Sequence, residues 1–207
     1  MARVGVIADT HCPEYLDSLP PALFDRLAGV DLILHAGDVG SLDTIRQLER
    51  IAPVHAVRGD HDGGLDQLPR ELTIEVGGRR LTAVHGNRSR LLEEPVTLVG
   101  TVSLGYLWPK PGLHRHLVHR FPDSDVIVYG HTHAAAIQRL GSKLLFNPGA
   151  VYQVTPEAAR RRLERGPGWF EWSWLQVARH RRRLPLASVG VLEISKAGVT
   201  ALVMPLS

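Results

Sequence analysis

Aspartate and histidine recur in short clusters along this chain, and each cluster follows a run of apolar residues. Five of the 11 histidines belong to these clusters. The clustered residues are Asp9, His11, Asp38, Asp60, His61, Asp62, His85, His131 and His133. Carboxylate and imidazole ligands without thiolates suit manganese, iron, zinc, cobalt or nickel. Because carboxylates gathered in one place need cations to offset their repulsion, we predict a metal site that holds two ions.

The apolar runs before the clusters have the length and composition of buried strands. They occupy residues 4–8, 32–34, 54–57, 81–84 and 126–129, and turn residues bound them. In open α/β sheets, ligands bind beyond the carboxyl ends of such strands. We therefore expect these strands to deliver the clustered side chains to one place.

The order of the remaining patterns predicts an α/β fold of mixed, α+β character. Helical spacing at residues 21–28 and 42–48 alternates with the first strands, which is typical of βαβ units and a parallel sheet. Hairpins are expected at residues 72–84, 138–146 and 189–203, each around a turn that contains glycine. We expect a four-layer αββα sandwich, in which two mixed β-sheets lie face to face and helices flank them.

Length and composition favour a single domain over residues 1–207, with insertions at about 88–123 and at 155–185. The formal net charge is only +3, and no apolar run reaches the roughly 18 residues of a membrane span. The N-terminal residues show no signal-peptide pattern. Cys12 is the single cysteine. We therefore expect no internal disulfide and a reducing, cytoplasmic setting.

The segment 155–185 combines arginines with tryptophans and has more than one interpretation. Basic residues interleaved with aromatic ones bind single-stranded nucleic acid through phosphate contacts and base stacking. The alternative is an amphipathic helical hairpin, in which Phe170, Trp174 and Val177 recur at helical spacing and pack inward. A lid over the site and a dimer contact are further alternatives.

The ordered set of motifs resembles the calcineurin-like metallophosphoesterase family, in particular its small bacterial and archaeal phosphodiesterase branch. The motifs that carry the resemblance are Asp9-Thr10-His11, Gly37-Asp38, Gly59-Asp60-His61-Asp62, His85-Gly86, Gly130-His131-Thr132-His133 and Asn147-Pro148-Gly149-Ala150. The resemblance covers roughly residues 1–154 and 186–207. Each motif is weak alone, but the ordered set is specific.

This resemblance implies two divalent metal ions, most often manganese, bridged by Asp38. The first ion would be held by Asp9, His11 and His133, and the second by Asp60, His85 and His131. The family chemistry is attack of a metal-bridging hydroxide on a phosphodiester, with ions about 3.5–4 Å apart that bind the phosphoryl oxygens. His61 stands at the position of the general acid, which contributes typically about 10²–10⁴-fold, and Asp62 would orient it.

Three positions near the motifs carry separate expectations. Asp60 replaces the asparagine that is usual in the family and adds one negative charge. We therefore predict tighter metal binding and weaker attraction for phosphate anions. Asn87 replaces a frequent histidine, so a substrate contact is expected to differ there. Arg58 is either a substrate-phosphate contact or a surface ion pair.

The leading hypothesis is a phosphodiesterase that acts on a small or nucleotide-like phosphate ester. One alternative is a nuclease or dinucleoside-polyphosphate hydrolase that uses the basic insertion. Another is a scaffold that resembles the retromer subunit of this fold, although the intact imidazole set and His61 favour an enzyme. The expected partner is the ester substrate, with nucleic acid and a homo-oligomer left open and no membrane. His114, His116 and His119 are interpreted as a solvated helix face because no acidic residue is near them in the sequence.

Overall fold

The computed structural model describes residues 1–86, 112–180 and 186–207. Within these ranges the chain forms two compact units. The larger unit contains residues 1–86, 114–152 and 186–207 and carries both sheets. Of the described residues, the smaller unit contains 112–113 and 153–180. Asn87 and Arg181 to Arg183 lie outside the described residues.

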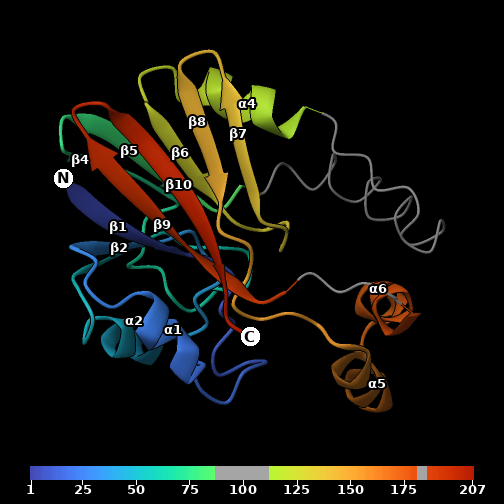
Figure 1. The fold of residues 1–207 in the computed structure, drawn as a ribbon. Coiled ribbons are helices and arrows are strands. Elements are labelled where there is room, and N and C mark those ends of the chain that lie inside the picture. The colour runs from blue at the N-terminus through green and yellow to red at the C-terminus, as the bar shows by residue number, and fades with distance from the viewer. Residues whose placement is uncertain (87–111, 181–185) are drawn as a thin grey trace. The chain divides into compact units, whose positions relative to one another are not determined.

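The first sheet has five strands and is covered on one face by two helices (Figure 1). Its order is β10 (Gly198–Pro205), β9 (Ser188–Ser195), β1 (Ala2–Ile7), β2 (Leu32–His35) and β3 (Val54–Ala56). Strands β1, β2 and β3 are parallel, whereas β9 is antiparallel to both of its neighbours. Helices α1 (Pro21–Arg26) and α2 (Leu42–Leu48) pack on this sheet through buried Leu23, Leu27 and Leu48. The βαβ prediction for the first third of the chain is confirmed.

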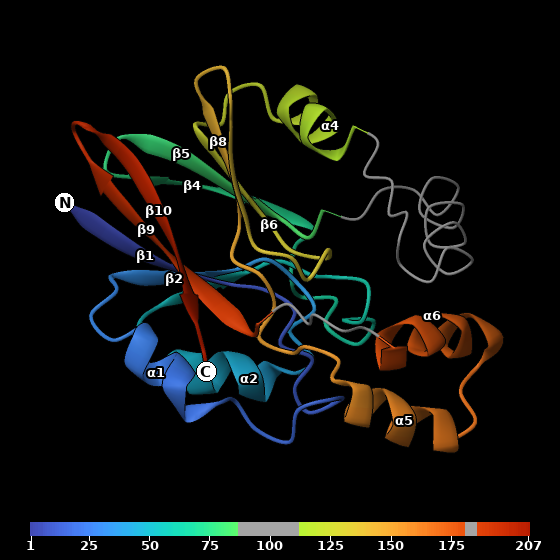
Figure 2. The same cartoon turned by 45° about the vertical axis from the view of Figure 1, so that its right-hand side comes forward.

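The second sheet also has five strands, and helix α4 (Leu113–Arg120) lies on its outer face (Figure 2). Its order is β4 (Glu71–Val76), β5 (Arg79–Val84), β6 (Val126–Tyr129), β8 (Lys143–Asn147) and β7 (Ala136–Leu140). Strands β5, β6 and β8 are parallel, and the hairpins β4–β5 and β7–β8 add antiparallel edges. All three expected hairpins are therefore present, including β9–β10.

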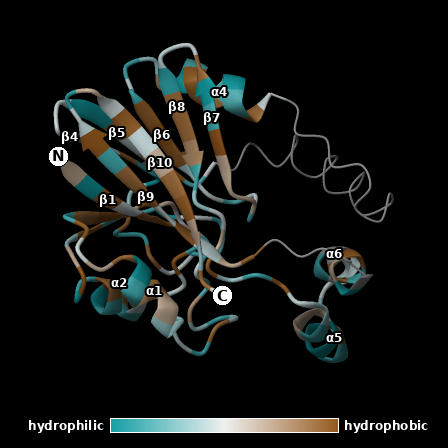
Figure 3. Cartoon of the chain, in the orientation of Figure 1, coloured by the Kyte–Doolittle hydropathy of each residue, from teal (hydrophilic) through white to brown (hydrophobic). Residues whose placement is uncertain are grey.

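Apolar side chains from both sheets meet in one core between them. Val6 and Leu34 from the first sheet and Leu81, Val126 and Phe146 from the second belong to the same buried cluster. Figure 3 shows these strands as hydrophobic stretches that end in more polar loops. Two mixed sheets face to face with helices outside confirm the predicted α/β sandwich. No helix in the described part of the chain is long and apolar enough to cross a membrane.

The smaller unit is a pair of helices, α5 (Pro156–Glu164) and α6 (Trp169–His180). The hydroxyl of Thr155 accepts a hydrogen bond from the Ala158 amide at 3.1 Å and so caps α5. Three buried residues, Ala159, Leu175 and Ala178, pack between the helices. This agrees with the helical interpretation of the segment, while the side chains of Phe170 and Trp174 lie outside what the structure describes.

The histidines of α4 do not share one environment. His116 and His119 are exposed, as expected for a solvated helix face. His114 instead places its Nε2 atom 2.7 Å from the hydroxyl of Tyr129, the last residue of β6. This contact ties the outer helix to the strand that leads into Gly130 and His131.

Candidate metal centre

Loops that follow β1, β2, β3, β5 and β6 converge because the strands are parallel neighbours within their sheets. The backbone amides of Asp9 and His11 donate to the carbonyls of Gly37 and Asp38, both at 3.0 Å. Two glycines permit the close approach. A Cβ atom on Gly37 would lie 2.6 Å from His85 Nδ1, and one on Gly59 would lie 2.2 Å from Asp38 Oδ1.

Five of the seven candidate ligands sit on strained backbone. Five non-glycine residues of the described chain have positive φ angles, between 48° and 64°. These residues are Asp9, His11, Asp38, His131 and His133. The left-handed conformation costs roughly 1–2 kcal/mol for each L-residue and persists only where the surroundings impose it. Its concentration at the candidate ligands indicates that the fold stores strain in order to aim these side chains.

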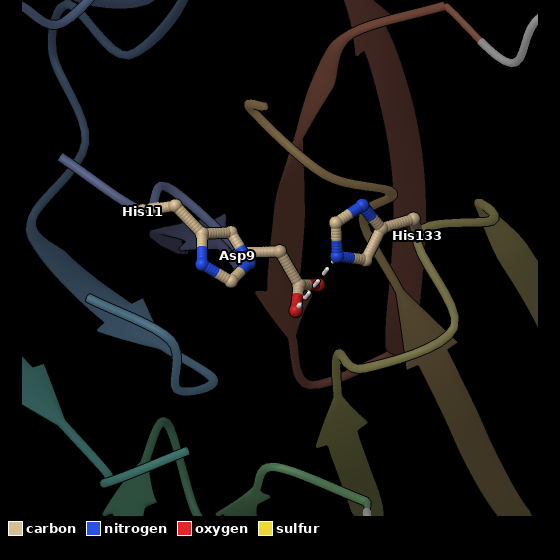
Figure 4. Close-up of side chains that lie close together, drawn as sticks. All are labelled: Asp9, His11 and His133. Carbon is tan, nitrogen blue, oxygen red and sulfur yellow. Dashed lines mark ion pairs between the residues drawn. The ribbon is translucent and has the colours of Figure 1, made fainter. Parts of the chain in front are cut away.

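Asp9, His11 and His133 form the first group of candidate ligands. One donor atom from each lies within 4.8 Å of the other two. His133 Nε2 is 3.6 Å from Asp9 Oδ1, and Figure 4 shows the two side chains pointing toward each other. Asp9 is fully buried, and its carboxylate accepts the His131 amide at 3.1 Å.

The second group contains Asp60, His85 and His131, with the same 4.8 Å limit on the separation of their donor atoms. Asp60 Oδ2 lies 3.4 Å from His131 Nδ1 and 3.8 Å from His85 Nε2. Asp38 stands between the two groups, because its Oδ2 atom is 3.5 Å from His11 Nε2 and 3.3 Å from His85 Nε2. The arrangement brings together all seven residues that the family resemblance implies as ligands.

One observation at His85 indicates that the donor set fits divalent cations. Its Nδ1 atom is 2.9 Å from the Ala36 carbonyl, which fixes Nδ1 as the protonated nitrogen. Its Nε2 atom is buried and makes no hydrogen bond to any described residue. A cation beside the carboxylates of Asp38 and Asp60 would satisfy it.

Burial and neighbouring charges shift the pKa values in this region. Burial raises the pKa of Asp9, and it lowers the pKa of His11 to about 4 and also that of His133. Both histidines are thus neutral near pH 7, as metal ligands must be. Burial alone would raise the pKa of Asp38, but the close contact with His85 and its charge outweigh burial and lower that pKa.

The expected catalytic residues have different partners from those predicted. His61 is half-exposed, and its Nδ1 atom lies 3.3 Å from Oε2 of Glu14, a residue that the sequence analysis missed. The buried carboxylate of Asp62 instead accepts the amides of Val39, Gly40 and Gly59 at 3.1, 2.9 and 2.8 Å. The expectation that Asp62 orients His61 has no support in these contacts, because the carboxylate holds the loop backbone.

Two further residues near the motifs are engaged away from the ligand groups. Arg58 forms an ion pair with Asp66, which matches the surface ion-pair alternative. Asn147 donates to the Gly130 carbonyl at 2.9 Å and accepts the Gly149 amide at 2.9 Å. It therefore braces the loop that carries His131 and His133. The Asn-Pro-Gly-Ala motif could have identified Asn147 from the sequence, whereas no local sequence pattern distinguishes Glu14.

Comparison with known proteins agrees with this architecture. Residues 2–162 match the model of the calcineurin-like phosphoesterase superfamily domain, and the chain belongs to that superfamily. It is 36% identical over 148 residues to a probable metallophosphoesterase of Methanothermobacter thermautotrophicus, covering 71% of this chain and 76% of the relative. It is 25% identical over 162 residues to a phosphodiesterase of Methanocaldococcus jannaschii, covering 71% and 82%.

Solved structures share the fold at lower sequence identity. Vps29 of Entamoeba histolytica in complex with Zn²⁺ has a TM-score of 0.63 and 20% identity, covering 99% of each chain. A novel archaeal phosphodiesterase has a TM-score of 0.53 and 18% identity, covering 98% of this chain and 99% of that chain. These likenesses concern the sandwich and not the activity.

Proposed function

We propose that this protein is a metal-dependent phosphodiesterase that hydrolyses a small or nucleotide-like phosphate ester. The observation that carries the proposal is the convergence of three carboxylates and four imidazoles in two groups that share Asp38. Superfamily membership supports it, as does the relative named as a phosphodiesterase.

Each group of ligands would hold one divalent cation. Asp9, His11 and His133 would form one set, and Asp60, His85 and His131 the other. Asp38, which lies close to His11 and to His85, would be shared by both. When bound, two such cations supply Lewis acidity toward phosphoryl oxygens and lower the pKa of a bound water. The oxygen and imidazole donors accept manganese, and zinc is bound by the Vps29 relative.

In this proposal His61 protonates the leaving group. Its amide donates to Asp38 Oδ1 at 2.8 Å, which anchors its backbone beside the shared ligand. Its side chain keeps 44% of its surface exposed, so a substrate can reach it. A protonated imidazole here would donate to the departing alkoxide as general acid. The chain itself therefore provides positioning and a proton.

The test combines metal analysis with hydrolysis assays on the full-length protein. We expect divalent metal to co-purify, and bis(p-nitrophenyl) phosphate to be cleaved after loading with manganese. His61→Ala should lower kcat by about 10²–10⁴-fold, whereas His116→Ala, a matched change at an exposed histidine of α4, should leave kcat unchanged. Absence of hydrolysis with every metal tried, from acid to alkaline pH, would overturn the proposal. Metal binding without hydrolysis would favour a scaffold role.

A second candidate is a nuclease, favoured by the surface of the helical pair. Trp169 and Trp172 of α6 are 72% and 48% exposed, and Arg160 and Arg161 of α5 are exposed as well. Exposed aromatic rings and guanidinium groups suit base stacking and phosphate contacts. Deleting residues 156–184 tests this candidate. Cleavage of the small ester by the same variant is the control. The nuclease candidate fails if the variant cleaves oligonucleotides as well as the native protein does.

A further inference from the structure

We propose that Glu14 is the positioning residue for His61, a role that rests on the proposed phosphodiesterase function. Glu14 lies in the turn after β1, which is closed by the Tyr15 amide donating to the His11 carbonyl at 2.8 Å. Its Oε2 atom is 3.3 Å from His61 Nδ1. No other carboxylate of the described residues lies within 4.0 Å of a ring nitrogen of His61.

The Glu14 carboxylate would determine which ring nitrogen of His61 carries the proton in the neutral imidazole. A neutral imidazole carries its proton on either nitrogen, and the partner of one nitrogen decides the role of the other. An Nδ1–H turned toward Glu14 would leave Nε2 to face the substrate, and the proton that Nε2 carries in the imidazolium would be the one donated to the leaving oxygen. The 3.3 Å separation is long for a hydrogen bond, but catalytic contacts commonly tighten when substrate binds.

Neighbouring rings restrict the remaining motion of His61. Its ring meets the His11 ring edge-on, with centroids 4.8 Å apart and planes at 82°. It also lies 6.0 Å from the Tyr15 ring in a similar T-shaped arrangement. Because the His61 amide is already held by Asp38, the side-chain torsions are what Glu14 and these rings must fix.

Glu14 also faces the candidate metal ligand His11. The His11 ring is buried, and its Nδ1 atom has no hydrogen bond to any described residue, while Glu14 Oε2 lies 3.7 Å away. A metal-ligating histidine usually directs its second nitrogen at a carboxylate or carbonyl. The Glu14 carboxylate thus lies within 4 Å of both the candidate ligand His11 and the candidate general acid His61. The buried carboxylate of Asp62 instead binds backbone amides.

The expected consequence depends on the leaving group. A proton donor matters most when the departing oxygen is strongly basic, and least when it leaves readily as nitrophenolate. Misorientation of His61 should therefore lower kcat more for esters with poor leaving groups than for esters with good ones. A residue that only stabilised the fold would lower activity on all esters to the same extent.

The first experiment compares kcat for methyl aryl phosphates whose leaving groups run from p-nitrophenol to unsubstituted phenol. Glu14→Ala should lose at least about tenfold more activity on the phenyl ester than on the nitrophenyl ester. Glu14→Asp should restore part of the difference. Asp17→Asn, at an exposed carboxylate of the same loop, is the matched control and should behave like the native protein. An equal loss across the series would overturn the proposal.

The second experiment needs no turnover. In the zinc-loaded protein, long-range ¹H–¹⁵N spectra report the tautomer of His61, assigned by comparison with His61→Gln. We expect the Nδ1–H form in the native protein and its loss in Glu14→Ala at unchanged zinc content. An unchanged tautomer, or a third zinc equivalent that disappears with Glu14, would overturn the proposal. If the native protein cleaves no ester, the proposed function fails while this spectrum still decides the role of Glu14.

Discussion

Nε2 of His85 lies 3.3 Å from Oδ2 of Asp38, and both side chains are buried. Burial alone would lower the pKa of His85, but the close contact with the negative charge of Asp38 outweighs it and raises that pKa to about 10. In the metal-free protein the two residues therefore form an ion pair. A cation bound between them would take the place of the proton on His85.

The first prediction is that metal binding releases a proton. Near pH 7 the metal-free protein carries a proton on His85 that the metal-bound protein cannot keep. Calorimetric titration with Mn²⁺ in two buffers of different ionisation enthalpy should show this release, and affinity should rise with pH up to about 10. Equal heats in both buffers, with pH-independent affinity, would contradict the ion-pair argument.

The second prediction concerns the stability of the metal-free protein in acid. Burial lowers the pKa values of His11 and His35 from 6.5 to about 4, so the unfolded chain takes up protons first. The contribution of these two histidines to stability should be full above pH 6.5 and fall toward pH 4, by about 3 kcal/mol for each histidine. The raised pKa of Asp9 offsets part of this loss.

Urea unfolding with a chelator present measures this pH dependence. The slope between pH 6.5 and pH 4 should flatten in His35→Gln, which removes one of the two buried histidines without touching a candidate ligand. If the free energy of unfolding stays constant or rises as the pH falls from 6.5 to 4, the buried imidazoles do not dominate the pH dependence of stability.

The third prediction is that Asp60→Asn weakens metal binding. The Asp60 carboxylate lies 3.4 Å from His131 Nδ1 and 3.8 Å from His85 Nε2, and the substitution removes its charge while keeping an oxygen donor. We expect the dissociation constant of the second metal to rise by about tenfold. Phosphate anions should bind more tightly to the variant. Metal affinity that holds or increases would make the charge argument wrong.

The fourth prediction assigns Asp62 to stability. Its buried carboxylate accepts three backbone amides, and Asp62→Asn would turn an amide donor toward at least one of them. We expect the free energy of unfolding to fall by about 2–4 kcal/mol. Asp66→Asn, which removes an exposed partner of Arg58, should cost about 1 kcal/mol or less. Unchanged stability with a large loss of kcat would instead place Asp62 in the reaction.

Local patterns in the sequence were enough to predict the sandwich and the clusters of aspartate and histidine, and the family resemblance then singled out seven of these residues as candidate ligands. Apolar runs that end in aspartate and histidine are a property of short segments, and parallel strands carry their ends to one edge. The hairpin β4–β5 was predicted for the same reason, because the alternating residues on both sides of Gly77 and Gly78 form a local sequence pattern. The single domain over residues 1–207, with insertions at about 88–123 and 155–185, stays a prediction.

Side-chain direction within the loops was decided by tertiary structure alone. Asp62 follows His61 directly in the chain, yet its carboxylate turns to the Val39, Gly40 and Gly59 amides, while Glu14 from another loop reaches His61. Sequence order determines which residues a strand delivers to the edge of a sheet. Which of them then face one another depends on backbone angles such as the positive φ of His11, and these are imposed by packing between distant loops.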